Sequence, residues 1–250
     1  MDNAKRVKAI VLAAGKGSRM KSDDAEMPKV MRRVCGLPLL SHVLGELSFF
    51  EKSDIILVVG YKRELVIDAY KEYVHAVQEQ QLGTGHAVMA AEAELRGFSG
   101  AVLICYGDMP LLKQNTYKAL IDFHFEANNH CSILSGTTDK PLAYGRIVRD
   151  DNGNFQKVVE DKDCNLEQKR ISELNSGVYV FDSQMLFEVL STVESNNSQG
   201  EYYLTDAPAI MLKRGAKVGL LKRELGEEII GVNNEDELAY IEDLIKVNAK

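Results

Sequence analysis

The sequence lacks several features that would place a protein in a specialised class. It contains no tryptophan, and its four cysteines lie far apart without any C-x-x-C pair. A disulfide framework and a zinc site are therefore both disfavoured, and buried free thiols are expected. The five histidines have no metal-ligand spacing either, and His124 falls on the apolar side of a predicted helix. No apolar run approaches the ~18 residues of a membrane-spanning helix. We therefore expect no membrane partner.

Basic residues are outnumbered by acidic ones, with 30 Lys and Arg against 37 Asp and Glu and a formal net charge of −7. This balance argues against a nucleic-acid partner, which would be held by phosphate neutralisation. Lys5, Arg6 and Lys8 precede an apolar run, but that run is too short for the core of a signal peptide. We therefore predict a cytoplasmic protein. The 250 residues, 45% of them hydrophobic, suffice for one large or two small domains.

The most informative stretch is the apolar run AIVLAA at residues 9–14, followed by GKGSRMK at residues 15–21. A short continuous apolar run is typical of a buried parallel strand, and open α/β sheets bind ligands where such strands end. The two glycines let backbone N–H groups approach a ligand, and three basic side chains lie among them. No Walker A motif is present, and Met20 breaks the dinucleotide pattern G-x-G-x-x-G. The turn therefore favours a phosphate-bearing ligand without specifying which.

A carboxylate follows another predicted strand. Residues 101–105 (AVLIC) form the most hydrophobic run, and YGDMP with Asp108 comes directly after it. An aspartate at this position commonly holds Mg²⁺, but a helix or turn cap is an equally good interpretation. The glycine-containing segment at residues 78–86 leads into a predicted helix over residues 87–95, a position suited to anions or polar groups.

Strand and helix patterns alternate through the first 140 residues and predict a mostly parallel, right-handed, three-layer α/β sheet. The expected strands are 9–14, 54–60, 73–78, 101–105 and 132–136; the expected helices begin at 37 and span 64–70, 87–95 and 115–129. The later part is richer in β-structure, with a hairpin of 145–149 and 155–159 and strands 173–182 and 218–221. Ser183 is expected to cap a helix over 184–193, and Asn234 with Glu237 forms a capping-box pattern for the last helix.

A series of motifs resembles, in order, those of a known family. LAAGKGSRM, MPKV, QEQQLGTGHAV, YGDMPLL, AYGRIVR, VVEDKD, ELNSGVYVF, GEYYLTD and GVNN are similar to motifs of bacterial N-acetylglucosamine-1-phosphate uridylyltransferases. In that family this part belongs to a bifunctional UDP-N-acetylglucosamine pyrophosphorylase. The resemblance extends from about Lys8 to Glu237. The first motif is shared by all sugar nucleotidyltransferases, whereas QLGTGHA, YGD, NSGV and VNN are much more specific.

The resemblance implies a GT-A-like (Rossmann-like) α/β fold with a smaller β-rich sugar-binding part. We expect a single nucleotidyltransferase domain over residues 1–250, with the nucleotide-binding part at about 1–140, the sugar-binding part at about 141–232 and a C-terminal helix at 233–250. The resemblance also implies a Mg²⁺-dependent reaction that joins UTP and N-acetylglucosamine 1-phosphate, giving the peptidoglycan precursor UDP-N-acetylglucosamine and pyrophosphate. Because the sugar phosphate is already ionised, catalysis consists of positioning and electrostatic stabilisation, with no general base.

Motif position also implies roles for individual residues. Those placed against the nucleotide and its phosphates are Leu12, Ala13, Ala14, Gly15, Arg19 and Lys29. Those that read uracil are Gln78, Gly83 and Thr84, and those that meet ribose, sugar or metal are Tyr106, Gly107 and Asp108. The residues expected to bind the amino sugar are Gly145, Glu160 and Asn175. The expected metal ligands are Asp108 and Asn233. The expected catalytic residues are the charged side chains Arg19, Lys29 and Asp108. A one-residue shift from Asn233 to Asn234 stays open.

Three departures from the family pattern affect these expectations. The loop between Met20 and Pro28 is longer, and Ala143 replaces a common glycine. A hexapeptide β-helix, which would carry acetyltransferase activity and form the family's trimer, is missing. We therefore expect no acetylation, a monomer, and either a monofunctional relative or an excised domain.

Two alternative functions stay open at this point. The chain could transfer a nucleotidyl group to another sugar 1-phosphate or from another base, with glucose 1-phosphate as an example. It could also be a catalytically silent regulator that binds sugar nucleotides. A regulator needs no clamp for a leaving group, so the presence of Arg19, Lys29, Asp108 and Asn233 argues for the enzyme.

Overall fold

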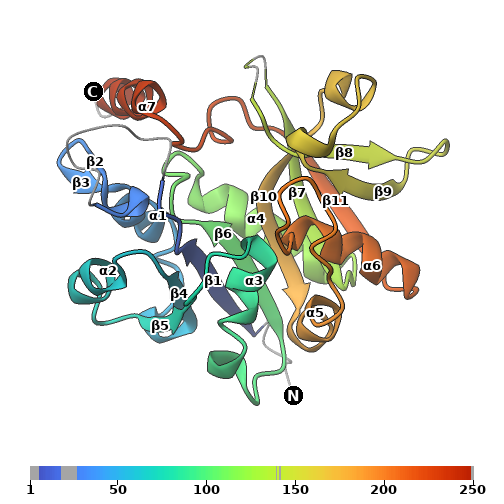
Figure 1. The fold of residues 1–250 in the computed structure, drawn as a ribbon, viewed down its shortest axis with the longest axis horizontal. Coiled ribbons are helices and arrows are strands. Elements are labelled where there is room, and N and C mark those ends of the chain that lie inside the picture. Colours follow the sequence, from blue (N-terminus) through green and yellow to red (C-terminus); the bar gives the residue numbers. More distant parts are fainter. Residues whose placement is uncertain (1–5, 18–26, 139, 141, 249–250) are drawn as a thin grey trace.

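The computed structural model describes residues 6–17, 27–138, 140 and 142–248. Within these ranges one nine-stranded sheet runs through the molecule, with helices on both of its faces (Figure 1). The main path of the sheet follows the order β11-β7-β10-β6-β1-β4-β5, and β8 pairs with both β10 and β9. The α/β fold class predicted from the sequence is confirmed.

The first half of the sheet is parallel. β1 pairs with β4 on one side and β6 on the other, so that Val11 lies opposite both Leu57 and Cys105. The strands are β1 Val7–Ala13, β4 Ile55–Val59, β5 Val74–Val77 and β6 Ala101–Tyr106. The helices of this half are α1 Leu39–Glu46, α2 Arg63–Ala69, α3 Thr84–Met89 and α4 Gln114–Glu126. A small ribbon of β2 Arg33–Val34 and β3 Leu37–Pro38 precedes α1.

The second half of the sheet is mixed, because β10 runs antiparallel to both β6 and β7 while β11 is parallel to β7. The strands are β7 Cys131–Thr137, β8 Arg146–Arg149, β9 Phe155–Val159, β10 Leu174–Asp182 and β11 Val218–Glu224. The helices are α5 Ser183–Leu190, α6 Ala207–Lys213 and α7 Glu235–Asn248. The predicted β8–β9 hairpin is confirmed. The division into nucleotide- and sugar-binding parts stays a prediction.

Successive residues of β1 enter different hydrophobic cores. Ala9, Val11 and Ala13 belong to the cluster that includes side chains of α1 and α4, whereas Ile10 and Leu12 belong to the cluster with side chains of α3 and α5. Strand side chains alternate between the two faces of a sheet, and all five of these are at most 8% exposed. Each of the buried valine, isoleucine and leucine side chains contributes about 1.5–3 kcal/mol. Packing on both faces therefore holds the end of β1 in place.

The helix predicted over residues 87–95 is wrong in its extent. α3 spans Thr84–Met89, and residues 93–95 form only a 3-10 turn. Beyond α3 the N–H group of Ala91 donates to the carbonyl three residues earlier at 3.0 Å. This tighter winding ends the α-helix, and the tertiary packing of the fully buried Ala91 outweighs the helix propensity of the alanine-rich sequence.

The cap predicted for the helix after β10 is wrong by one residue. Asp182 caps α5, since its Oδ1 accepts hydrogen bonds from the N–H groups of Gln184 at 3.1 Å and Met185 at 2.9 Å. Ser183 instead donates its hydroxyl to the Phe98 carbonyl at 3.3 Å. The extended backbone of Asp182, the last residue of β10, has the geometry that an N-cap needs.

Three further predictions concern the start of α1, the cysteines and membrane-spanning helices. α1 begins at Leu39, because residues 37–38 pair in the β2–β3 ribbon. Cys105 and Cys131 are buried free thiols as expected, whereas Cys35 is exposed. Of the helices in the described ranges, none has the length and apolar character required to cross a membrane.

Candidate active site

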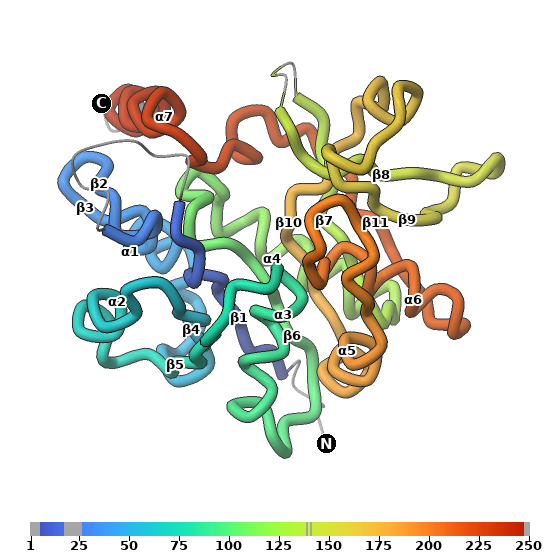
Figure 2. The backbone as a smooth tube through the Cα atoms, in the orientation of Figure 1, coloured from blue at the N-terminus to red at the C-terminus, as the bar shows by residue number. Residues whose placement is uncertain are grey.

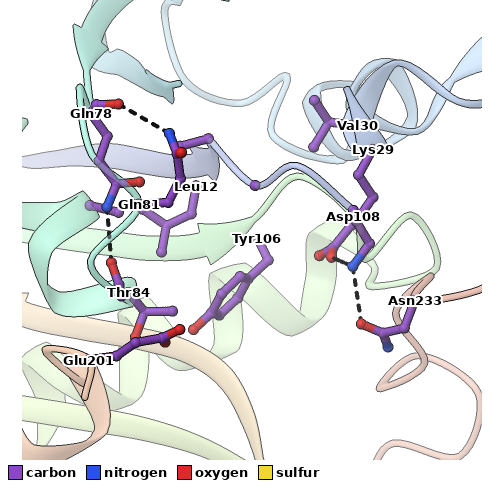
Figure 3. Close-up of a pocket in the computed structure, with 15 residues that line it drawn as sticks. Leu12, Lys29, Val30, Gln78, Gln81, Thr84, Tyr106, Asp108, Glu201 and Asn233 are labelled. Atoms are coloured by element: carbon purple, nitrogen blue, oxygen red, sulfur yellow. Dashed lines mark hydrogen bonds and ion pairs between the residues drawn. The ribbon is translucent and has the colours of Figure 1, made fainter. Parts of the chain in front are cut away.

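An open pocket of about 280 Å³ lies where β1 and β6 end (Figure 3). Parallel sheets bind ligands at this edge. The lining residues that the sequence analysis assigned to the site are Leu12, Ala14, Gly15, Lys29, Gln78, Gly83, Thr84, Tyr106, Asp108 and Asn233. The lining residues without an assigned role are Gly17, Val30, Gln81, Ala87 and Glu201. Glu201 could have been found, because its motif GEYYLTD was the one to which no residue role was given.

Other assigned residues do not line this pocket: Ala13, Gly107, Gly145, Glu160 and Asn175. Ala13 is 2% exposed and lies in the core on the α1 face of the sheet. A Cβ at Gly107 would lie 3.1 Å from Val30 Cγ1, so this position permits close packing beneath the site. Arg19, a catalytic assignment, lies outside the described residues.

Lys29 forms the centre of the polar end of the pocket. Its Nζ makes an ion pair with Asp108 Oδ2 and donates a hydrogen bond to Asn233 Oδ1 at 3.1 Å (Figure 3). Pro28 approaches in an extended conformation, and the buried Val30 anchors the 3-10 turn that carries the lysine. Only 13% of the Lys29 side chain is exposed, so it is not a solvated surface lysine.

The Asp108 carboxylate does not cap the following helix. α4 begins at Gln114, whose N–H donates to Glu46 Oε2 at 2.7 Å. The backbone of Asp108 is held by Val232, whose N–H donates to the Asp108 carbonyl at 2.9 Å. This bond joins the end of β6 to the segment before α7. The carboxylate is therefore left for a cation, and the cation that it meets is the Lys29 ammonium.

Asn233 and Asn234 have different partners. Asn234 Oδ1 accepts from the Glu237 N–H at 2.8 Å, and Glu237 Oε2 accepts from the Asn233 N–H at 2.5 Å. The Asn234 half of the predicted capping box is therefore confirmed, whereas the Glu237 side chain bonds to the N–H of Asn233, one residue before the cap. The Asn233 side chain takes no part in the cap, and it faces Lys29 in the pocket.

Gln78 and Gly83 form the opposite end of the pocket. Gln78 is only 4% exposed, and its Nε2 lies 3.0 Å from the Gly83 carbonyl and 3.1 Å from His86 Nδ1. Gly83 has a φ of +111°, and a Cβ there would lie 2.6 Å from the Tyr202 carbonyl, so only glycine fits. Figure 2 shows the segment with Tyr202, before α6, passing beside the start of α3.

Gly145, Glu160 and Asn175 come together although they lie on three separate segments. A Cβ at Gly145 would lie 3.5 Å from Asn175 Cβ and 3.6 Å from Glu160 Oε2. Glu160 Oε1 accepts a hydrogen bond from Thr205 Oγ1 at 3.0 Å, and burial raises the pKa of the Glu160 carboxyl. Asn175 Nδ2 donates to Tyr179 Oη at 2.7 Å. We call these three residues the Gly145–Glu160–Asn175 cluster.

Tyr106 connects this cluster to the pocket, and Figure 3 shows its ring in the middle of the lining side chains. Burial raises the pKa of the Tyr106 phenol, and the nearby carboxylates of Glu160 and Asp108 raise it further. The phenol therefore stays protonated and can donate a hydrogen bond at neutral pH. Glu160 of the Gly145–Glu160–Asn175 cluster and Asp108 of the polar end of the pocket thus both act on this one phenol.

No three Asp, Glu, His or Cys side chains gather as a metal-binding group within residues 6–17, 27–138, 140 and 142–248. Asp108 and Asn233 present one carboxylate and one amide oxygen to a common cation, Lys29 Nζ. Mg²⁺ usually takes only one or two carboxylates from the protein and completes its shell with water and substrate phosphates. The donor set at this end of the pocket therefore fits a cation that binds together with a phosphate ligand.

Comparison with known proteins identifies the class to which this fold and site belong. Residues 9–161, more than half of the chain, match the MobA-like NTP transferase domain. The chain therefore belongs to this family and is a nucleotidyltransferase.

Among its relatives is the bifunctional protein GlmU. The chain is 46% identical over 239 residues to GlmU of Streptococcus thermophilus (strain ATCC BAA-491 / LMD-9) and to GlmU of Streptococcus agalactiae serotype V (strain ATCC BAA-611 / 2603 V/R). These alignments cover 95% of this chain and 51% of each relative. GlmU of Alkaliphilus metalliredigens (strain QYMF) is 43% identical over 242 residues, 96% of this chain and 52% of the relative. The chain thus spans about half the length of these curated relatives, and the family resemblance is confirmed.

A solved structure has the same fold. It is that of a Bacillus anthracis protein provisionally described as a glucose-1-phosphate thymidylyltransferase, in complex with sucrose. The TM-score is 0.72, with 96% of this chain and 95% of the other covered. Because the identity is only 20%, this likeness shows the nucleotidyltransferase fold alone.

Proposed function

We propose that this nucleotidyltransferase is a Mg²⁺-dependent uridylyltransferase. It joins UTP and N-acetylglucosamine 1-phosphate and releases UDP-N-acetylglucosamine and pyrophosphate. The observation that carries the proposal is the convergence of Lys29, Asp108 and Asn233 at one end of a pocket whose other end is formed by Gln78 and Gly83. A charged end and an amide-lined end match the triphosphate and the base of a nucleotide. The motif resemblance supports the choice of uracil and of the amino sugar.

We assign Asp108 and Asn233 to the Mg²⁺. Their side-chain oxygens already share one cation, since the Lys29 ammonium stands in for a metal between them. Carboxylate and amide oxygens are ligands that a hard cation prefers. When bound, Mg²⁺ supplies positive charge that offsets the repulsion between the phosphates of the two substrates.

Lys29 acts through its charge and its reach. Its flexible stem lets the ammonium exchange Asp108 for a phosphate oxygen, at the place where negative charge accumulates during transfer. We assign Arg19, outside the described residues, to the leaving pyrophosphate on the motif resemblance alone. The sugar phosphate oxygen bonds to the α-phosphorus, and the bond to the β-phosphate oxygen breaks with its electron pair on pyrophosphate. Alignment of this kind contributes up to ~7–11 kcal/mol.

The Gly145–Glu160–Asn175 cluster is our assignment for the amino sugar. A carboxylate and an amide side by side offer acceptors and donors for hydroxyl and acetamido groups. Thr205, which donates to Glu160, directly follows Leu204, whose N–H donates to Thr84 Oγ1 at 3.0 Å. One short segment therefore contacts both the base-binding loop and the sugar cluster, and this supports a site that binds two substrates together.

A pyrophosphate-release assay across nucleoside triphosphates and sugar 1-phosphates tests the proposal. We expect the highest turnover with UTP and N-acetylglucosamine 1-phosphate, and none without Mg²⁺. Equal turnover with glucose 1-phosphate would contradict the amino-sugar assignment. Binding of UDP-N-acetylglucosamine without any pyrophosphate release would favour the silent regulator instead. The cytoplasmic location and the monomeric state stay predictions.

A further inference from the structure

His86 contacts a base-binding residue without itself lining the pocket. It lies in α3, the short helix that follows the Gly83 loop, and its side chain is half-buried. Its Nδ1 is 3.1 Å from Nε2 of Gln78. The motif resemblance implies no role for this histidine, although it is part of the QLGTGHA motif.

The orientation of the Gln78 amide follows from the Gly83 carbonyl. A carbonyl can only accept, so the Gln78 atom at 3.0 Å from it must be the donating Nε2. The reversed amide would place two oxygens against each other. The same Nε2 faces His86 Nδ1, and since an amide nitrogen can only donate, Nδ1 must accept. The neutral His86 ring therefore carries its proton on Nε2.

Both N–H groups of Gln78 are thereby occupied, one by Gly83 and the other by His86. Among the residues that the structure describes, the hydrogen bonds of the Gln78 side chain all run through Nε2, and none involves Oε1. Gln78 lines the pocket, and Figure 3 shows its amide nitrogen on a dashed bond while its amide oxygen carries none. At this position the pocket consequently offers an acceptor and no donor.

We propose that His86 is a positioning residue for nucleotide selectivity: by holding the second N–H of Gln78, it keeps the amide from offering a donor to the base. The N3–H of uracil or thymine can donate to Gln78 Oε1, whereas N3 of cytosine is an acceptor and opposes it. This inference rests on the proposed function, in which Gln78 reads the base. The new element is His86, the group that fixes which atom of the Gln78 amide is presented to the base.

The backbone around His86 is held firmly enough for this task. Gly85 N–H donates to the Tyr202 carbonyl at 2.7 Å, and Tyr202 N–H donates to the Leu82 carbonyl at 2.8 Å. The rings of His86 and Tyr202 lie 6.3 Å apart between centroids, inclined by 34°. Without a partner at position 86, an N–H of the buried Gln78 would lose its acceptor, and leaving such a group unpaired is costly. The amide, still bonded to the Gly83 carbonyl through one N–H, could then rotate about that bond and bring its second N–H toward the pocket.

Two variants of His86 test the proposal. His86→Leu removes the acceptor, whereas His86→Asn keeps an acceptor oxygen close to the position of Nδ1. We measure the affinities for UTP and CTP by isothermal titration calorimetry without sugar phosphate, together with kcat/KM for both nucleotides. His86→Leu should lower the UTP-over-CTP preference roughly tenfold, with His86→Asn restoring much of it. His42→Leu, which removes a half-buried histidine bonded to the Val34 carbonyl, should leave the preference unchanged.

The outcomes separate this inference from the proposed function. A wild-type protein that binds CTP as well as UTP would contradict the assignment of uracil itself. A wild-type preference for UTP that persists in a folded His86→Leu variant would overturn the role of His86 alone. If His86→Leu does not fold, ¹⁵N NMR of histidine-labelled wild-type protein decides. The Nε2–H tautomer of His86 is expected, and an Nδ1–H tautomer would overturn the inference.

Discussion

Lys29 Nζ donates a hydrogen bond to Asn233 Oδ1 over 3.1 Å, although 204 positions separate the two residues in the sequence. The same ammonium is paired with Asp108 at the end of β6. Three segments, one before α1, one after β6 and one before α7, thus meet at one cation. Polar side chains that lie far apart in the sequence thus form one end of the pocket together.

Removal of the Lys29 charge should slow the reaction without unfolding the protein. We expect Lys29→Ala to lower kcat by about 10²–10³, the loss typical when one group that stabilises developing charge is deleted. Pyrophosphate release at saturating substrate measures the effect. Lys157→Ala, at an exposed position of β9, is the matched control. A Lys29→Ala enzyme as fast as this control would contradict the role of the lysine.

Asp108→Asn should abolish Mg²⁺-dependent turnover while the melting temperature stays close to that of the wild type. The amide keeps the shape of the carboxylate but not the charge that a divalent cation requires. Titration of Mg²⁺ in the presence of UTP should show weaker metal binding, which provides a readout besides activity. Asp151→Asn in the exposed β8–β9 turn should behave as wild type. Undiminished metal binding by Asp108→Asn would refute the metal assignment.

Substitutions of the two neighbouring asparagines should have different effects, because Asn233 is assigned to binding and Asn234 to the cap of α7. Asn234→Ala removes the acceptor for the Glu237 N–H and should lower the free energy of unfolding by about 0.5–2 kcal/mol, with most of the turnover kept. Asn233→Ala should do the reverse, because its side chain faces Lys29 and takes no part in the cap. Urea unfolding and the pyrophosphate assay, run on both variants, measure the two effects. Equal losses of turnover in both would show that the assignment to Asn233 is wrong.

His124 should make the protein less stable at acidic pH. Burial lowers the pKa of this histidine from 6.5 to about 4, and its Nδ1 lies 3.1 Å from Ser132 Oγ in the core. Below pH 6.5 the unfolded chain binds a proton at His124 that the folded chain does not bind. The free energy of unfolding should therefore fall as the pH falls from 6.5 toward 4, by up to about 1.4 kcal/mol per pH unit.

Urea unfolding of the wild type and of His124→Gln, at several pH values between 4 and 7.5, isolates this contribution. The variant should lose less free energy of unfolding over the same range, because glutamine does not titrate. His42→Gln serves as the matched control, since that histidine is half-buried and is not among the groups that shift the pKa of His124. Identical pH dependence in the wild type and His124→Gln would contradict the prediction.

Local patterns in the sequence predicted the parts of the fold that local physics controls. The run at residues 9–14 is apolar at every position, and the structure buries β1 on both faces. Asn234 and Glu237 are three residues apart, and their hydrogen bonds at the start of α7 need no distant partner. The extent of α3 was not predictable, since packing of Ala91 in the core outweighed the helix propensity around it.

The candidate site was predictable only in part. The motif resemblance named Lys29, Asp108 and Asn233, but no local rule distinguishes Lys29 from a surface lysine, because its burial depends on residues far away in the chain. Glu201 and His86 received no role. They reach the site through the contact between the segment before α6 and the start of α3, a contact that spans more than a hundred residues.

The sequence by itself determined the alternation of strands and helices, the glycine-rich basic turn after the first strand and the cap of the last helix, because each depends on residues within a few positions. Only the tertiary structure decided which charges meet and how the Gln78 amide is turned. Lys29 is withdrawn from water by Asp108 and Asn233, and Gln78 is oriented by Gly83 and His86. Such contacts form when the sheet brings the ends of its strands together, and neither composition nor periodicity encodes them.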